Sequence, residues 1–259
     1  MCSRGTCLLY GLEVLDAVRR YVASSQCDCI ALSGGLDTSL VALAARLEHL
    51  RLKSVTVYYE RGLPRDLWYA SSLARVLGFE HEAIPVDDGY IASRSRLVLD
   101  CTRRLDYIEV RNDVVFLAAL EWSRARGCKC IYTGDGGDEL FAGYEFTRRL
   151  WGGALREAQV RLGVRGRYPA LELAECMGVD ARAPLLSDEV VEVAMHAPTC
   201  CLLGERLEGK YLVRLVLDEY GLGWLAWRPK TPAEGGAGTD ALGREALEAI
   251  TGLRLGLHA

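Results

Sequence analysis

The chain has 259 residues and a formal net charge of −4, and 50% of its residues are hydrophobic while 25% are charged. This length predicts one or two globular domains, and the composition excludes disordered, fibrous and membrane-spanning proteins. A mildly acidic chain is also not expected to be a general nucleic-acid binder. Residues 1–5 lack the pattern of a signal peptide, so we expect a cytoplasmic protein.

Short apolar runs alternate with amphipathic stretches through the first half of the chain. Residues 13–24 carry Val14, Val18 and Val22 at helical spacing, and Pro64 is expected at the first position of a helix. The helices predicted in this half are residues 13–24, 39–50, 64–77 and 112–126. The strands predicted between them are residues 29–32, 53–59, 82–86 and 129–133. This alternation predicts an α/β fold in which a parallel sheet has helices on both faces.

The strand signals fade after about residue 146. The helices predicted beyond that point are residues 155–161, 170–177, 188–196 and 210–219, and a glycine-containing stretch precedes a final helix. We therefore expect an α/β core over residues 1–150 and a helical region over residues 151–259 that completes the functional site.

The strongest local signal is the segment SGGLDTS at residues 33–39, between a predicted strand and a predicted helix. Glycines let the backbone approach an anion, hydroxyls donate hydrogen bonds, and a helix N-terminus favours negative charge. Neither a Walker lysine nor a dinucleotide fingerprint is present. Asp37 would repel a phosphate unless a cation lay between them, so we expect Asp37 to bind Mg²⁺. The competing interpretation is a glycine turn that caps a helix.

A second polar segment, TGDGGDE at residues 133–139, also follows a predicted strand. In a parallel sheet both segments open at the carboxyl edge, where ligands bind in this architecture. Asp138 would then share the metal ion with Asp37. Taken alone, the second segment is equally compatible with a polar turn.

These segments resemble a known family. Residues 33–39 resemble the pyrophosphatase loop of the N-type ATP pyrophosphatases, and TGDGGDELFAGY at residues 133–144 resembles the second motif of the synthetase domain of asparagine synthetases and of β-lactam and carbapenam synthetases. GVDARAPLL at residues 178–186 resembles a third motif, and residues 210–214 with WRPK at 227–230 resemble a fourth region. The four blocks occur in the family's order.

The resemblance implies an adenine nucleotide α-hydrolase-like (HUP-type) fold and an AMP-forming ligase. A substrate carboxylate would attack the α-phosphorus of ATP, and ammonia or an amine would then attack the acyl-adenylate. Arg182 and Lys210 also match motif positions, Arg182 as an ion-pair partner or a ligand and Lys210 as a residue that caps the fold. The implied ATP-binding residues are Leu32, Ser33, Gly34, Gly35, Asp37, Thr38, Ser39, Val57 and Gly134, the implied magnesium ligands are Asp37 and Asp138, and the implied catalytic residues are Lys230, Asp135 and Asp180.

Some positions depart from the family pattern. Asparagine synthetases have Glu at the positions of Asp135 and Asp180, whereas the β-lactam-forming relatives have Tyr at the first. A carboxylate at position 135 therefore favours an amide-forming enzyme of asparagine biosynthesis, although its side chain is one methylene shorter. Residues 105–115 lack the small, proline-containing pattern of asparagine synthetases. The residues expected to define a different acceptor there are Tyr107, Glu109, Arg111 and Asn112.

Typical asparagine synthetases begin with a glutaminase domain whose nucleophile is a cysteine after the initiator Met. This chain begins with Met1 and Cys2, but its phosphate-binding segment starts at Ser33, which leaves no room for such a domain. We therefore interpret Cys2 as incidental. Ammonia is expected from solution or from a separate glutaminase subunit, unless another amine is the nucleophile.

Ten cysteines are many for a cytoplasmic enzyme. Cys27 and Cys29 precede one nucleotide loop and Cys128 and Cys130 the other, on strands that are neighbours in the implied fold. Cross-strand disulfides are the favoured interpretation, ahead of reduced thiols and a zinc site. One Asn and two Gln suit a thermophile, in which intracellular disulfides are known.

Two other functions remain open from the sequence. One is an N-type ATP pyrophosphatase that adenylates a different acceptor, such as a β-lactam or carbapenam precursor or a tRNA base. The other is a nucleotide-binding protein without catalysis. The blocks after residue 130 favour the ligase, and the presence of Asp37, Asp138 and Lys230 together argues against a silent binder.

Overall fold

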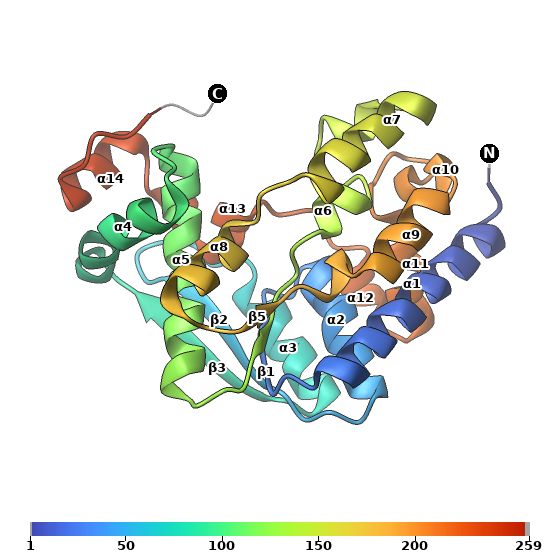
Figure 1. Cartoon of the computed structure of the whole chain (residues 1–259), viewed down its shortest axis with the longest axis horizontal. Coiled ribbons are helices and arrows are strands. Elements are labelled where there is room, and N and C mark those ends of the chain that lie inside the picture. Colours follow the sequence, from blue (N-terminus) through green and yellow to red (C-terminus); the bar gives the residue numbers. More distant parts are fainter. Residues whose placement is uncertain (1, 257–259) are drawn as a thin grey trace.

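The computed structural model describes residues 2–256, and its centre is a five-stranded parallel sheet with strand order β3-β2-β1-β4-β5 (Figure 1). The order reverses between β1 and β4, so a crevice opens outside their carboxyl ends, where ligands bind in such sheets. The strands are β1 Cys29–Ala31, β2 Lys53–Tyr59, β3 Glu80–Val86, β4 Ile131–Tyr132 and β5 Ala181–Arg182.

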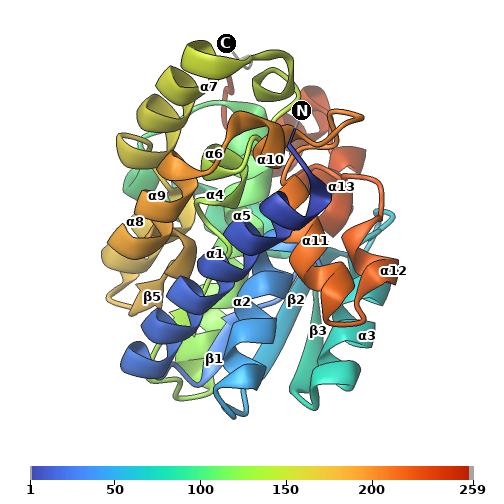
Figure 2. The same ribbon diagram turned by 90° about the vertical axis from the view of Figure 1, so that its right-hand side faces the viewer.

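Helices cover both faces of the sheet and bury two hydrophobic clusters against it (Figures 1 and 2). One face carries α1 Arg4–Ser25, α2 Leu36–Leu47, α3 Leu67–Leu77, α9 Asp188–His196, α10 Thr199–Leu203, α11 Tyr211–Glu219 and α12 Gly223–Ala226. The other face carries α4 Asp88–Thr102, α5 Tyr107–Ala125, α8 Pro169–Met177 and α14 Arg244–Thr251. The shorter helices α6 Gly137–Leu140, α7 Gly152–Gln159 and α13 Ala233–Ala237 lie in connections. None of the helices in residues 2–256 has the length and apolar character needed to cross a lipid bilayer.

The structure confirms the predicted α/β architecture, and it differs in several boundaries. The helix predicted from Pro64 begins at Leu67, because Asp66 precedes it with its N–H bonded to the carbonyl of Gly236. The helix predicted from residue 112 already begins at Tyr107, where the carboxylate of Asp106 accepts hydrogen bonds from two N–H groups of the first turn. Local capping and tertiary contacts therefore set both boundaries.

Several elements were not predicted, namely helix α4, strand β5 and the short helices α6, α10, α12 and α13. Helix α4 buries Ile91, Ser95 and Val98 at helical spacing, but a serine on its buried face weakens the apolar pattern. Strand β5 comes from the region predicted to be helical, and two residues are too few to show an alternating pattern. The sheet therefore draws its edge strand from the second half of the chain.

Five disulfides cross-link the fold, and no cysteine in the described residues is free. Cys27 pairs with Cys130 and Cys29 with Cys128, so the predicted cross-strand disulfides between β1 and β4 are confirmed. The interpretation of Cys2 as incidental is wrong, since Cys2 pairs with Cys200. The remaining disulfides are Cys7–Cys201, which ties α1 to α10, and Cys101–Cys176, which ties α4 to α8.

We predict that reduction strongly lowers the free energy of unfolding. The bonds Cys27–Cys130 and Cys29–Cys128 span 103 and 99 residues, and closing a loop of roughly 100 residues restricts the unfolded chain by about 4–5 kcal/mol. Guanidinium unfolding with and without reductant measures the difference. Mass spectrometry after alkylation of unfolded, unreduced protein should find no labelled thiol. Ten labelled thiols with an unchanged unfolding midpoint would contradict the disulfide assignment.

Candidate functional site

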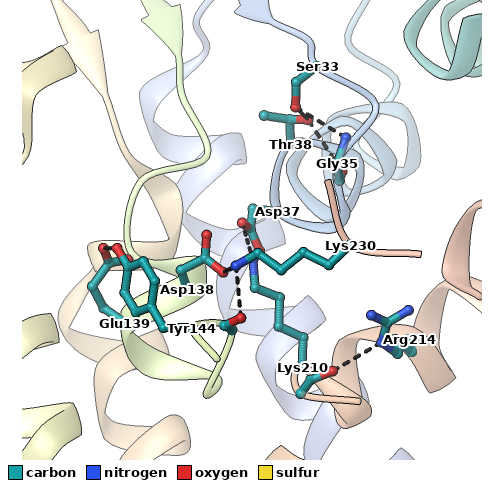
Figure 3. Close-up of polar contacts among 12 residues, drawn as sticks. Ser33, Gly35, Asp37, Thr38, Asp138, Glu139, Tyr144, Lys210, Arg214 and Lys230 are labelled. Carbon is teal, nitrogen blue, oxygen red and sulfur yellow. Dashed lines mark hydrogen bonds and ion pairs between the residues drawn. The ribbon is translucent and has the colours of Figure 1, made fainter. Parts of the chain in front are cut away.

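The phosphate-binding segment predicted at residues 33–39 forms the turn between β1 and α2, at the carboxyl edge of the sheet. Gly34 has a φ of +67°, and a side chain there would lie 2.6 Å from the backbone nitrogen of Ala70 at the start of α3. The hydroxyl of Ser33 accepts a hydrogen bond from the N–H of Gly35 at 3.1 Å and contacts the hydroxyl of Thr38 at 3.1 Å (Figure 3). The turn is therefore preformed, as an anion cradle must be.

The second polar segment lies directly against the first. A side chain at Gly134 would meet Thr38 at 2.8 Å, and one at Gly137 would overlap the carboxylate of Asp37. These glycines let the turn after β4 approach α2 closely enough to place Asp138 beside Asp37. The structure therefore brings the two predicted magnesium ligands together.

Two lysines join these carboxylates (Figure 3). Nζ of Lys210 lies 2.5 Å from Oδ2 of Asp37 and 2.8 Å from Oδ1 of Asp138. Nζ of Lys230 donates to the same oxygen of Asp138 and, at 2.8 Å, to the carbonyl of Gly143. We call Asp37, Asp138, Lys210 and Lys230 the charge cluster.

Electrostatics in the charge cluster favour the ionised forms of the Lys210–Asp138 pair. Burial alone would raise the pKa of Asp138, but Lys210 and Lys230 outweigh burial and hold the pKa at about 2. Burial alone would lower the pKa of Lys210, but the two carboxylates outweigh it and raise the pKa. Burial lowers the pKa of Lys230. Lys230 also lies 5.2 Å from the ring centroid of Tyr144, which adds a cation–π contact.

Lys210 matches a motif position of the family, with capping of the fold as the alternative role, and the structure places its ammonium between Asp37 and Asp138. The residue precedes α11 with a φ of +53°, and its N–H donates to the carbonyl of Phe141 at 2.7 Å. Nε of Arg214 donates to the carbonyl of Gly209 at 3.0 Å and fixes the turn before the lysine. A side chain at Gly143 would collide with Cε of Lys210 and with Asp138, so only glycine lets the lysine pass.

Arg228 is a site residue that the sequence reasoning missed. It is buried, and its guanidinium donates to the carbonyl of Gly34 at 2.7 Å and to the carboxylate of Asp66 at 2.5 Å. Its plane also lies over the ring of Tyr69, 3.8 Å from the centroid. Arg228 therefore fastens the phosphate turn to the start of α3. Its place in the WRPK block, two residues before Lys230, was the available signal.

Two further buried acids have raised pKa values, and one of them, Asp135, interacts with Asp37 of the charge cluster. Asp135 accepts a hydrogen bond from the hydroxyl of Thr133 at 2.6 Å, and burial raises its pKa to about 6. Asp113 on α5 was not predicted as a site residue. It is 1% exposed, its Oδ2 has no hydrogen-bond partner in the described part of the chain, and burial raises its pKa to about 8. An acid beside the apolar run that begins at Val114 was the signal in the sequence.

Other predicted residues lie outside the charge cluster. Asp180, just before β5, pairs with Arg182 at 2.8 Å, and its side chain is 47% exposed. Leu32 and Val57 are buried at the carboxyl ends of β1 and β2. Ser39 is fully buried on α2, and its hydroxyl has no partner among residues 2–256.

The residues expected to define the acceptor site make different kinds of contact in the structure. Arg111 donates to the carbonyl of Leu242 at 3.0 Å and lies over the ring of Tyr107. Glu109 lies 3.6 Å from Arg104. The buried Oδ1 of Asn112 has no hydrogen-bond partner within the described residues. Arg111 is therefore held by the C-terminal segment, but its Nε, like Oδ1 of Asn112, has no hydrogen-bond partner in the described residues.

Among curated proteins, asparagine synthetase B (glutamine-hydrolyzing) of Escherichia coli strain K12 is 28% identical over 248 residues, covering 86% of this chain and 44% of that protein. A probable asparagine synthetase (glutamine-hydrolyzing) of Schizosaccharomyces pombe is 30% identical over 237 residues, covering 80% of this chain and 41% of that protein. The chain therefore spans less than half the length of these relatives.

Similar solved structures include the NMN synthetase of Francisella tularensis, with a TM-score of 0.38, 15% identity, and coverage of 93% of this chain and 90% of that one. The NH3-dependent NAD synthetase of Campylobacter jejuni has a TM-score of 0.37 and 15% identity, and covers 75% of this chain and 95% of that one. The family model described as asparagine synthase matches residues 12–175, which is more than half of the chain. This match confirms the resemblance carried by the sequence motifs: the chain belongs to the asparagine synthase family.

Proposed function

We propose that the chain is an ATP-dependent, AMP-forming ligase that activates a substrate carboxylate and transfers it to ammonia or an amine. The observation that carries this proposal is the charge cluster, in which Asp37 and Asp138 from two separate turns meet Lys210 and Lys230 beside a preformed anion cradle. Membership of the asparagine synthase family supports the same chemistry.

The turn after β1 would hold the triphosphate of ATP. Backbone N–H groups at the start of α2 and the hydroxyls of Ser33 and Thr38 face the same place, and the helix N-terminus favours negative charge. Ser39 supplies a hydroxyl without a partner in the described structure. Gly34 lets the turn pack against α3, Gly35 leaves the Ser33 hydroxyl uncrowded, and Gly134 lets the second turn approach Thr38. Leu32 and Val57 would line the adenine end of the site.

The donor set of the site fits Mg²⁺. Carboxylate oxygens are its preferred protein ligands, and Oδ1 of Asp37 is buried without a hydrogen-bond partner in residues 2–256. Asp37 and Asp138 would hold the ion, which when bound neutralises negative charge on the phosphate oxygens. This charge neutralisation is what allows a carboxylate to approach the triphosphate.

Lys230 is the group best placed to act on the reacting atoms. Its side chain is 29% exposed, whereas that of Lys210 is 7% exposed, so Lys230 reaches solvent at the mouth of the site. A substrate carboxylate oxygen would bond to the α-phosphorus as the bond to the pyrophosphate oxygen breaks. We propose that the ammonium of Lys230 stabilises the charge that develops there, the kind of fixed electrostatic stabilisation that contributes most to many enzymes.

The second half-reaction needs a proton acceptor. The nitrogen of ammonia or an amine would attack the acyl carbon, AMP would leave, and the nitrogen would release a proton. Asp135, with a pKa of about 6, is ionised at neutral pH and is our proposed acceptor, because a base works best when its pKa lies near the operating pH. Asp180 pairs with Arg182, so we propose for it a role at the rim of the site.

The source of the nitrogen is a separate proposal. The relatives named above carry "glutamine-hydrolyzing" in their names, and this chain spans less than half of each. We propose that the described residues use ammonia or an amine supplied from solution or from a separate glutaminase subunit, and that a small carboxylic acid is the other substrate.

The ligase proposal is tested by exchange of labelled pyrophosphate into ATP across a panel of carboxylic acids. We expect exchange with at least one acid and Mg²⁺, because formation of an acyl-adenylate is reversible. ATP binding is measured in parallel by calorimetry. Binding of ATP without exchange in the presence of any acid would overturn the proposal.

We predict that Asp37→Asn and Lys230→Ala each lower kcat by about 10²–10³-fold, the usual cost of removing one group that stabilises transition-state charge. Circular dichroism should show an unchanged fold, since Lys210 keeps its contact with Asp138 in both variants. Lys129→Ala is the matched control and should retain full activity, because Lys129 precedes the amino end of β4 whereas the site lies at the carboxyl edge of the sheet. Full activity of Asp37→Asn or Lys230→Ala would refute the role of that residue.

We predict that kcat/KM rises with pH through a value of about 6, because burial raises the pKa of Asp135 to about 6 and only its ionised form accepts a proton. In Asp135→Asn, kcat/KM should no longer rise with pH through this value, and it should be about 10²–10⁴-fold lower than in the wild type. Asp135→Glu, which introduces the residue found in asparagine synthetases, should keep the rise with pH and the rate of the wild type. A pH profile of Asp135→Asn identical to that of the wild type would assign the proton to another group.

A further inference from the structure

The formal charges of the four residues in the charge cluster cancel one another. Lys210 contacts both carboxylates through one ammonium, at 2.5 and 2.8 Å, whereas Lys230 contacts only Asp138. Two ammonium groups therefore face two carboxylates, and their formal charges sum to zero.

The position of the Lys210 ammonium conflicts with a cation bound by both acids. Mg²⁺ binds carboxylate oxygens at 2.0–2.1 Å, so an ion that bridges Asp37 and Asp138 would lie where Nζ now lies between them. Like charges at such a separation repel strongly in a buried site. The ammonium and the cation therefore exclude each other from this position.

The backbone around Lys210 fixes the position of this residue. The residue is 5% exposed and holds a φ of +53°, a conformation that is uncommon for residues other than glycine. The backbone N–H of Lys210 donates a hydrogen bond to the carbonyl of Phe141. Gly143 has no side chain that would collide with Cε of Lys210. Together these two features fix the position of the Lys210 side chain. One oxygen of Asp37 nevertheless stays buried without a hydrogen-bond partner in the described residues, so the ammonium does not satisfy the pair completely.

We propose that Lys210 is an internal counter-ion of the two acids: its ammonium holds Asp37 and Asp138 together and must leave before a divalent cation binds both. This inference rests on the proposed function for the identity of the cation. It makes Lys210 a positioning residue that couples metal binding to nucleotide binding. The triphosphate supplies the negative charge that receives the displaced ammonium, so the cation enters together with ATP.

The test is Mn²⁺ binding in the absence of nucleotide, measured by electron paramagnetic resonance on the whole chain. We expect weak binding by the wild type and at least about tenfold tighter binding by Lys210→Met, which leaves two acids facing one lysine. Lys230→Met is the matched control, because it removes the same charge but touches only Asp138. A smaller gain for Lys230→Met supports the proposal. Equal gains in the two variants, or no gain in Lys210→Met, would overturn it.

Thermal unfolding keeps the test decisive if Lys210→Met is unstable. In a chelator this variant should melt below the wild type, because two buried carboxylates repel, and Mn²⁺ without nucleotide should restore its melting temperature. If the variant does not fold, the wild type decides. Tight binding of Mn²⁺ by the wild type without nucleotide would overturn the proposal.

These measurements separate the inference from the ligase proposal. They need no carboxylic acid and no turnover, so a failure of pyrophosphate exchange with every acid would leave the Mn²⁺ results standing. Conversely, exchange activity together with tight nucleotide-free Mn²⁺ binding by the wild type would reject only the role of Lys210.

Discussion

The structure depends on matching opposite charges that are buried at the edge of the sheet. Lys210 follows Asp37 by 173 residues along the chain, and yet its ammonium lies between that carboxylate and Asp138. A buried charge without a partner is very costly, so Lys210 lowers the cost of burying both acids. The functional site is therefore completed only when the last third of the chain packs against the sheet.

Two further buried cations extend the same principle. Arg228 binds the carbonyl of Gly34 and the carboxylate of Asp66, and Arg214 binds the carbonyls of Gly209 and Ala226. Residues 33–143 supply the turns, glycines and acids, and residues 210–228 supply cations that hold them in place. Guanidinium groups suit this task, because their planar set of donors reaches several acceptors at once.

The sequence predicted the parts of the site that lie in one continuous segment. It did not predict contacts between residues that are far apart along the chain. Residues 33–39 carry their chemistry in one short segment after a strand, and the structure places that segment as predicted. Lys210 and Arg228 lie in recognisable motif blocks, but only the fold shows which acids they meet. Helix α3 begins at Leu67, directly after Asp66, whose carboxylate accepts a hydrogen bond from Arg228. The position of Pro64 alone did not predict this boundary. Strand β5 is too short for any pattern.

The disulfides between β1 and β4 fix more than the stability of the chain. These strands pair over only two residues each, so few ladder hydrogen bonds define their register, and the bonds Cys27–Cys130 and Cys29–Cys128 define it covalently instead. Strands held in this way cannot slide to absorb an inserted or deleted residue. An insertion or deletion between either cysteine pair and its turn would therefore displace that turn from the opposite one.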